Sequence, residues 1–74
     1  MVTLRLWTED QQDARMIALL YSATPGVRLR SASGGRVTLD CRDDEVAYRV
    51  ESLLDDDDAV VRYERRHGPV LVVA

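Results

Sequence analysis

The sequence predicts a mixed α+β fold of one small domain, with its segments in the order β-α-β-β-α-β. Three observations predict it: apolar and polar residues alternate in several short segments, two longer segments carry apolar residues at helical spacing, and a Gly-Gly pair separates two alternating segments. A chain of 74 residues has room for a single domain, 1–74, with a small core. Its 46% apolar and 31% charged residues are typical of a globular protein.

The first strand and the first helix follow from the start of the chain. Apolar residues alternate with outward-facing ones over residues 2–7, which predicts a half-buried strand. Thr8 is predicted to cap a helix from Glu9 to about Ser22, with Gln11 completing a capping box. The residues of its apolar stripe are Ala14, Ile17, Ala18 and Tyr21, flanked by Leu20.

The middle of the chain predicts a β-hairpin. Residues 27–33 and 36–41 both alternate, and Gly34-Gly35 between them suits a two-residue turn that needs positive φ. Arg28 and Arg30 are expected to point outward. The residues expected to face the core are Val27, Leu29, Val37, Leu39 and Cys41.

A second helix and a last long strand complete the predicted order. Asp43 or Asp44 is expected to cap a helix that ends near Leu54. Its apolar stripe is Val46, Ala47, Val50, Leu53 and Leu54. The run Asp55–Asp58 is expected to be a solvated loop.

The strand predicted over residues 59–66 has an ambiguous phase. We place Val61 and Tyr63 toward the core, with Arg62 and Glu64 outward. Residues 70–74 are predicted to form a short C-terminal strand or an extended tail.

Right-handed crossovers on an antiparallel sheet place both helices on the same face. The predicted architecture is therefore a two-layer sandwich: an antiparallel sheet with two helices on one face, plus the short C-terminal strand.

Part of the chain resembles the helix-to-strand passage of ferredoxin-like small domains. The resemblance is carried by Ala18-Leu19-Leu20, by Thr24-Pro25-Gly26-Val27-Arg28-Leu29 and by Gly35-Arg36-Val37-Thr38-Leu39, about half of the chain. Heavy-metal-associated domains and ACT regulatory domains share this pattern. It implies a ferredoxin-like βαββαβ sandwich, but this fold serves many functions.

The two domain families imply different ligands. Heavy-metal-associated domains carry paired cysteines after the first strand, whereas this chain has Trp7-Thr8-Glu9-Asp10 there, so no metal is expected. ACT domains bind small ligands between paired subunits, which keeps a metabolite sensor as an alternative function. The glycine-rich turn that usually follows their first strand is absent here.

The strand phases predict a basic surface on the open side of the sheet. Asp40 and Glu64 are the only carboxylates expected there. The residues expected to bind a partner are Arg5, Trp7, Arg28, Arg30, Arg36 and Arg62. Rows of guanidinium groups suit carboxylates or phosphates, which they bind through two hydrogen bonds. The alternative is a solvated face on which arginine covers strand surface.

These features favour a non-enzymatic module that docks another protein through the arginine-rich sheet. No set of acid, base and nucleophile stands out that would indicate an enzyme, and no cofactor is expected. Binding of a nucleic-acid backbone is a further alternative. Specific RNA recognition on a sheet needs stacked aromatic residues, and the open face is expected to offer only Trp7. A protein is therefore expected as the partner rather than a nucleic acid.

The apolar end of the chain predicts association of two copies. Val70, Leu71, Val72 and Val73 are apolar on both strand phases, whereas a sheet with one solvated face should alternate. Pairing of edges in a homodimer would cover this segment, and packing within the monomer is the alternative. The single cysteine and the absence of a signal-peptide or membrane-spanning pattern predict a reducing, cytoplasmic setting.

Overall fold

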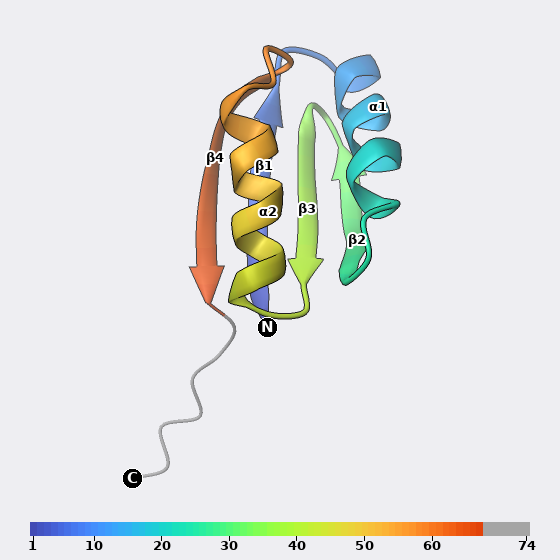
Figure 1. Ribbon diagram of the computed structural model, residues 1–74. Coiled ribbons are helices and arrows are strands. Elements are labelled where there is room, and N and C mark those ends of the chain that lie inside the picture. Colours follow the sequence, from blue (N-terminus) through green and yellow to red (C-terminus); the bar gives the residue numbers. More distant parts are fainter. Residues whose placement is uncertain (68–74) are drawn as a thin grey trace, which may run out of the picture.

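The computed structural model describes residues 1–67 as a four-stranded antiparallel sheet with two helices. The elements are β1 (Val2–Thr8), α1 (Gln11–Ser22), β2 (Val27–Ser33), β3 (Arg36–Cys41), α2 (Asp44–Asp55) and β4 (Val60–His67). The strand order is β2-β3-β1-β4, and both helices lie on the same face of the sheet (Figure 1). The predicted α+β class and antiparallel sheet are confirmed. The strand expected over residues 70–74 lies outside the described residues.

The core lies between the sheet and the helices. Inward residues of β1 and β3 are almost completely buried, as their alternation predicts. They are Val2, Leu4, Leu6, Val37, Leu39 and Cys41. The helices contribute Ala14, Ile17, Ala18, Tyr21, Val46, Ala47, Val50 and Leu54. Neither helix of the described chain combines the length and hydrophobicity that crossing a bilayer requires.

Helix α1 begins later than the predicted capping box. Its N-cap is Asp10, whose carboxylate accepts a hydrogen bond from the backbone N–H of Asp13 at 2.8 Å. Thr8 is the last residue of β1, and its single hydroxyl proton is shared between the carbonyl oxygens of Asp10 at 2.8 Å and Gly35 at 3.0 Å. The predicted N-cap at Thr8 is therefore wrong, because its hydroxyl closes the end of the sheet instead.

The hairpin between β2 and β3 forms as predicted, with a turn that requires glycine. Gly34 and Gly35 have φ values of +58° and +78°, which suit a type I′ turn. A Cβ atom on Gly35 would lie 3.2 Å from the carbonyl oxygen of Thr8. The turn thus also packs closely against the end of β1.

Strand β2 lies at an edge of the sheet and contains a bulge. Its register with β3 shifts between Leu29 and Ser31, so Arg30 is the extra residue. Val27 packs against the core as expected. Leu29, also predicted to be buried, is 40% exposed. This prediction is corrected because an edge strand has a neighbouring strand on one side only.

Helix α2 begins as predicted, with Asp43 as its N-cap. The Asp43 carboxylate accepts from the backbone N–H of Val46 at 3.0 Å, and this bond lowers the pKa of Asp43. The predicted apolar stripe is too wide at its end. Leu54 is buried, but Leu53 is 55% exposed. Adjacent helix positions point about 100° apart, so the core accepts one of them and not the other.

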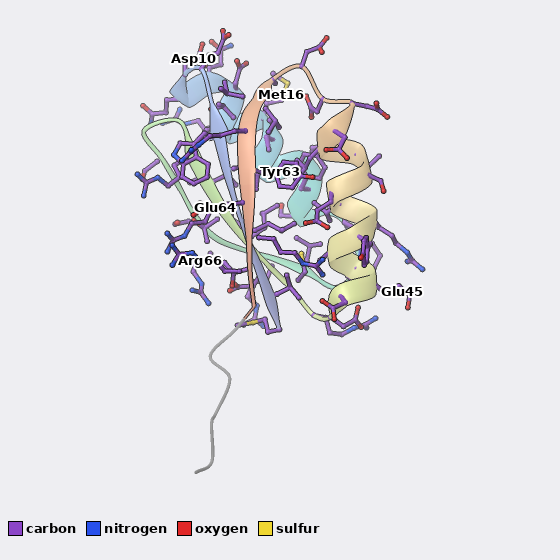
Figure 2. The ribbon with its side chains drawn as sticks, turned by 90° about the vertical axis from the view of Figure 1, so that its left-hand side faces the viewer. Asp10, Met16, Glu45, Tyr63, Glu64 and Arg66 are labelled. Atoms are coloured by element: carbon purple, nitrogen blue, oxygen red, sulfur yellow. The ribbon has the colours of Figure 1, made fainter. Side chains whose placement is uncertain are left out.

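Strand β4 shows which way the ambiguous last strand faces. Its register with β1 shifts near the end of β1, and Val61 is the extra residue of this bulge. Val61 is 60% exposed, so its predicted inward position is wrong, and Val60 packs against the core instead. The inward position of Tyr63 is confirmed. Figure 2 shows Tyr63 on the α2 side of β4 and Glu64 on the opposite side.

The acidic run Asp55–Asp58 has a structural role that its solvated appearance did not predict. Asp57 accepts a hydrogen bond from the Tyr21 hydroxyl at 3.0 Å and another from the backbone N–H of Ala59 at 3.0 Å. Asp55, at the end of α2, accepts from the Tyr63 hydroxyl at 3.0 Å. The run therefore connects α1, the end of α2 and β4.

One arginine of β4 points toward the helices. Arg65 pairs with Leu4 in the sheet register, and its guanidinium contacts Asp44 at 2.6 Å and Glu51 at 3.7 Å. It also lies over the Tyr48 ring, with Cζ 5.0 Å from the centroid. Its Nε is buried without a hydrogen-bond partner in the described chain. Arg65 thus holds α2 against β4 by charge rather than by apolar packing.

We expect Arg65→Met to lower the free energy of unfolding by about 1–3 kcal/mol, because it leaves the mostly buried Glu51 without its counter-charge. Adding Glu51→Gln should restore part of the loss. Urea denaturation followed by circular dichroism measures both effects. The matched control is Arg49→Met, which breaks an exposed pair with Glu45 and should cost less than about 0.5 kcal/mol. Equal losses for the two methionine variants would contradict this role of Arg65.

We also expect stability to fall at alkaline pH. Burial raises the pKa of Tyr21, and its hydrogen bond to Asp57 raises it further; burial also raises the pKa of Cys41. The unfolded chain therefore ionises at lower pH than the folded one, so stability is complete below the ordinary thiol value of 9.0 and declines above it. The urea midpoint should drop between about pH 9 and pH 11, less steeply in Tyr21→Phe. A flat profile would contradict this expectation.

Candidate functional site

The side of the sheet that faces away from the helices carries most of the arginines. The register places outward residues of all four strands beside one another on this open side. We call this surface the arginine face: Arg5, Arg28, Arg30, Arg36, Arg62 and Arg66, together with Trp7. In Figure 2, Glu64 and Arg66 lie on the side of β4 that faces away from α2.

Trp7 lies in the middle of one row of the arginine face. It pairs with Arg36 on β3 and with Arg62 on β4. The Cζ atom of Arg62 is 4.2 Å from the centroid of the indole ring, and that of Arg36 is 5.7 Å away. Two cations therefore lie over one aromatic ring, an arrangement that favours cation–π attraction.

Among the described residues, Asp40 is the one largely buried carboxylate on the open side of the sheet. It is 8% exposed and is hydrogen-bonded by the Thr3 hydroxyl at 2.9 Å and by Nε of Arg30 at 2.9 Å. The bulge at Arg30 explains this contact, because the extra residue brings its side chain to Asp40 beside the register partner Arg28. Asp40 thus fixes the position of Arg30 while neutralising part of its charge.

Glu64 is the other carboxylate that residues 1–67 place on this side, and its ion pairs are long. Arg5 lies 3.9 Å and Arg66 lies 3.7 Å from its Oε1. Both pairs are exposed and should contribute little to stability. Within residues 1–67, no carboxylate comes within ion-pair distance of Arg36 or Arg62. The face therefore keeps uncompensated positive charge on both sides of Trp7.

A hollow of about 550 Å³ opens on the arginine face beside the β2–β3 turn. Guanidinium and hydroxyl groups line it, and we call it the hairpin hollow. These groups belong to Arg5, Arg30, Arg36, Ser31, Ser33 and Thr38. The lining can donate many hydrogen bonds and contains no carboxylate.

The structure brings together all six residues predicted to bind a partner. Arg5, Trp7, Arg36 and Arg62 lie in adjacent rows, Arg30 lies beside Asp40, and Arg28 lies at the end of the same face. The sequence analysis missed Arg66, although the alternation of Arg62 and Glu64 extends to it. The residues predicted as dimer contact, Val70 to Val73, lie outside the described residues.

A second surface that the sequence analysis missed lies on the helical layer. Met16, Leu19 and Leu20 of α1 and Leu53 of α2 are each more than half exposed. A hollow of about 610 Å³ includes Leu20 and Leu53 and is bordered by Asp56–Asp58. The sequence signal was the three apolar residues of α1 outside its predicted stripe.

The remaining reactive side chain of the described chain is buried. Cys41 is fully covered, and this burial raises the pKa of its thiol, so the nucleophilic thiolate is disfavoured. No group of three or more histidine, cysteine, aspartate or glutamate side chains in residues 1–67 could hold a metal ion. The arginine face is accordingly the site on which a function can be argued.

Comparison of the chain with protein-family models, curated proteins and solved structures gives no match.

We expect Arg62 to shield Trp7 from solvent more than Arg36 does, because its guanidinium is closer to the ring. Arg62→Ala should increase acrylamide quenching of Trp7 fluorescence and cost about 0.5–1 kcal/mol of stability. Arg36→Ala should have a smaller effect on both. Trp7 is the only tryptophan, so the signal is unambiguous. Arg15→Ala, on α1, serves as the control, and quenching that is the same in all three variants would contradict the expectation.

Proposed function

We propose that this chain is a ferredoxin-like, non-enzymatic module that docks an acidic protein partner on its arginine face. The observation that carries the proposal is the uncompensated charge of Arg36 and Arg62 on both sides of Trp7, on a sheet surface that neither helix covers. Arginine and tryptophan are the residues that most often dominate the binding energy of protein interfaces.

The ferredoxin-like assignment is supported by the chain path. The order β2-β3-β1-β4 has each helix crossing between two parallel strands that are separated by a third, antiparallel one. This is the arrangement of a split βαβ unit, used here twice. It leaves one sheet face open by construction, because both crossovers lie on the other face.

An acidic protein segment suits this face better than a nucleic-acid backbone. Arg62 already lies over the Trp7 ring at 4.2 Å, so it occupies part of the one aromatic surface that the described residues offer on this face for stacking a base. Asp40 and Glu64 would also repel a continuous line of phosphates. Carboxylates spaced along a protein surface can instead avoid these two positions and bind the guanidinium groups with two hydrogen bonds each.

Partner binding should depend on the charge of the arginine face rather than on the charge of the whole molecule. The test compares Arg36→Glu/Arg62→Glu with Arg15→Glu/Arg49→Glu, which makes the same change in net charge on the helices. Binding of a glutamate-rich peptide is measured by fluorescence anisotropy. The first variant should bind the peptide at least about tenfold more weakly than the wild type, equivalent to about 1.4 kcal/mol, and the second variant should bind it as the wild type does. Equal binding by both variants would refute the proposal.

A single-stranded oligonucleotide of the same net charge as the peptide distinguishes the classes of partner. We expect it to bind more weakly than the peptide at the same ionic strength. Tighter binding of the oligonucleotide, with an affinity that falls steeply with salt, would replace the protein partner by nucleic acid. Partners captured from nuclease-treated lysate count in support only when the purified partner binds the wild type and not Arg36→Glu/Arg62→Glu.

A further inference from the structure

The hairpin hollow carries more specific chemistry than the rest of the arginine face. Three guanidinium groups, those of Arg5, Arg30 and Arg36, line it together with three hydroxyl groups. We propose that this hollow binds a phosphoryl group, carried by a phosphorylated side chain of the docked partner. The proposal rests on the function proposed above, because it names the chemistry that one part of the same face recognises.

The hydroxyl groups of the hollow have unused hydrogen-bonding capacity. Within the described chain, those of Ser31, Ser33 and Thr38 make no hydrogen bond to protein, unlike the nearby hydroxyl of Thr3, which donates to Asp40. Ser31 and Thr38 are register partners, and Thr38 pairs in turn with Arg5. Donors from three strands therefore lie in one row across the floor of the hollow.

The guanidinium groups of the hollow also keep free donors. Nε of Arg30 donates to Asp40, whereas its terminal nitrogens make no hydrogen bond to protein within the described chain. Among the described residues, Arg5 has one long ion pair, with Glu64, and Arg36 lies over the Trp7 ring without an ion pair. Because an arginine carries five N–H donors, the three side chains can surround an anion that presents several oxygens.

The charge balance favours a phosphoryl group over a carboxylate. The three guanidiniums are opposed by Asp40, and by a share of Glu64, which Arg66 also contacts. The single negative charge of a carboxylate would leave part of the excess positive charge unbalanced. A phosphomonoester carries roughly −1.5 to −2 charges at neutral pH and three acceptor oxygens. The extra acceptors also match the hydroxyl donors.

The backbone of the hollow is held in place before any ligand binds. The Gly34–Gly35 turn is tied to β1 by the hydrogen bond from the Thr8 N–H to the Gly35 carbonyl at 2.7 Å. The bulge and Asp40 fix Arg30 from the other side. Such preorganisation reduces the entropy cost of binding a small group.

The proposal is tested by NMR titration of the ¹⁵N-labelled chain at constant ionic strength. The probes are inorganic phosphate, blocked phosphoserine and blocked aspartate. We expect the amide signals of Ser31, Ser33 and Thr38 to shift saturably with the first two probes. Blocked aspartate should bind about tenfold more weakly, and the signals of α1 should not move.

Variants separate a specific site from general attraction to arginine. Arg36→Gln and Arg30→Gln should each weaken phosphoserine binding severalfold, whereas Arg49→Gln, on α2, should not. Ser33→Ala leaves the charge and the fold intact and should weaken phosphoserine more than aspartate. Shifts spread over both faces, the absence of saturation, or equal binding of phosphoserine and aspartate would each overturn the proposal.

The phosphoryl site and the docking function can fail separately. If glutamate-rich peptides bind the arginine face but phosphoserine does not enter the hollow, the docking function stands and the phosphoryl site is wrong. If phosphoserine binds but Arg36→Glu/Arg62→Glu binds the peptide as well as Arg15→Glu/Arg49→Glu does, the phosphoryl site stands and the docking function is wrong. Free phosphoserine that binds more tightly than a phosphopeptide would identify a small phosphorylated molecule as the source.

Discussion

The register of β1 is the constraint on which the rest of the structure depends. This strand pairs with both β3 and β4, and its Leu4 and Leu6 are completely buried under the helices. Arg5 and Trp7 alternate with these leucines and therefore lie on the open side. Because side chains in a strand alternate with a period of two, a slip of one residue would put Arg5 into the core. Burial of the leucines, at about 1.5–3 kcal/mol each, thus also determines the position of Trp7.

The two bulges show where this alternation stops, and both affect the arginine face. At Arg30 the extra residue of β2 brings a second arginine to Asp40, beside the register partner of that carboxylate. In β4, Val61 is an extra residue without a register partner. Arg62, rather than Val61, therefore pairs with Trp7 and lies beside it on the open side. Both bulges occur on the edge strands, where an unpaired residue costs least. The edges therefore adapt to a face whose positions the inner strands define.

The parts of the site that the sequence predicted are the outward-facing positions of the strands. Arg5, Trp7 and Arg36 could be placed because their apolar neighbours alternate without interruption. On β4 the outward position of Arg62 was predicted correctly, but Val61 was misplaced, because Val60 and Val61 are equally apolar and only the pairing with β1 decides which is buried. Arg65 was unpredictable for a different reason. The inward-facing guanidinium is stabilised by Asp44 and Glu51 on α2, and the sequence pattern does not show which residue of β4 this helix packs against.

The separation of charge between the two faces explains how an acidic protein can present a basic surface. The net charge of −3 is a property of the whole chain, but charges separated by more than about 8 Å are screened at physiological ionic strength. A partner close to the sheet therefore responds mainly to the arginine face, and one that approaches the other side meets acidic groups such as Asp13 and Glu45 on the helices. An acidic partner of the kind proposed would be attracted by the sheet and repelled by the helices. The charges that would supply this attraction would thus also select the orientation in which such a partner docks.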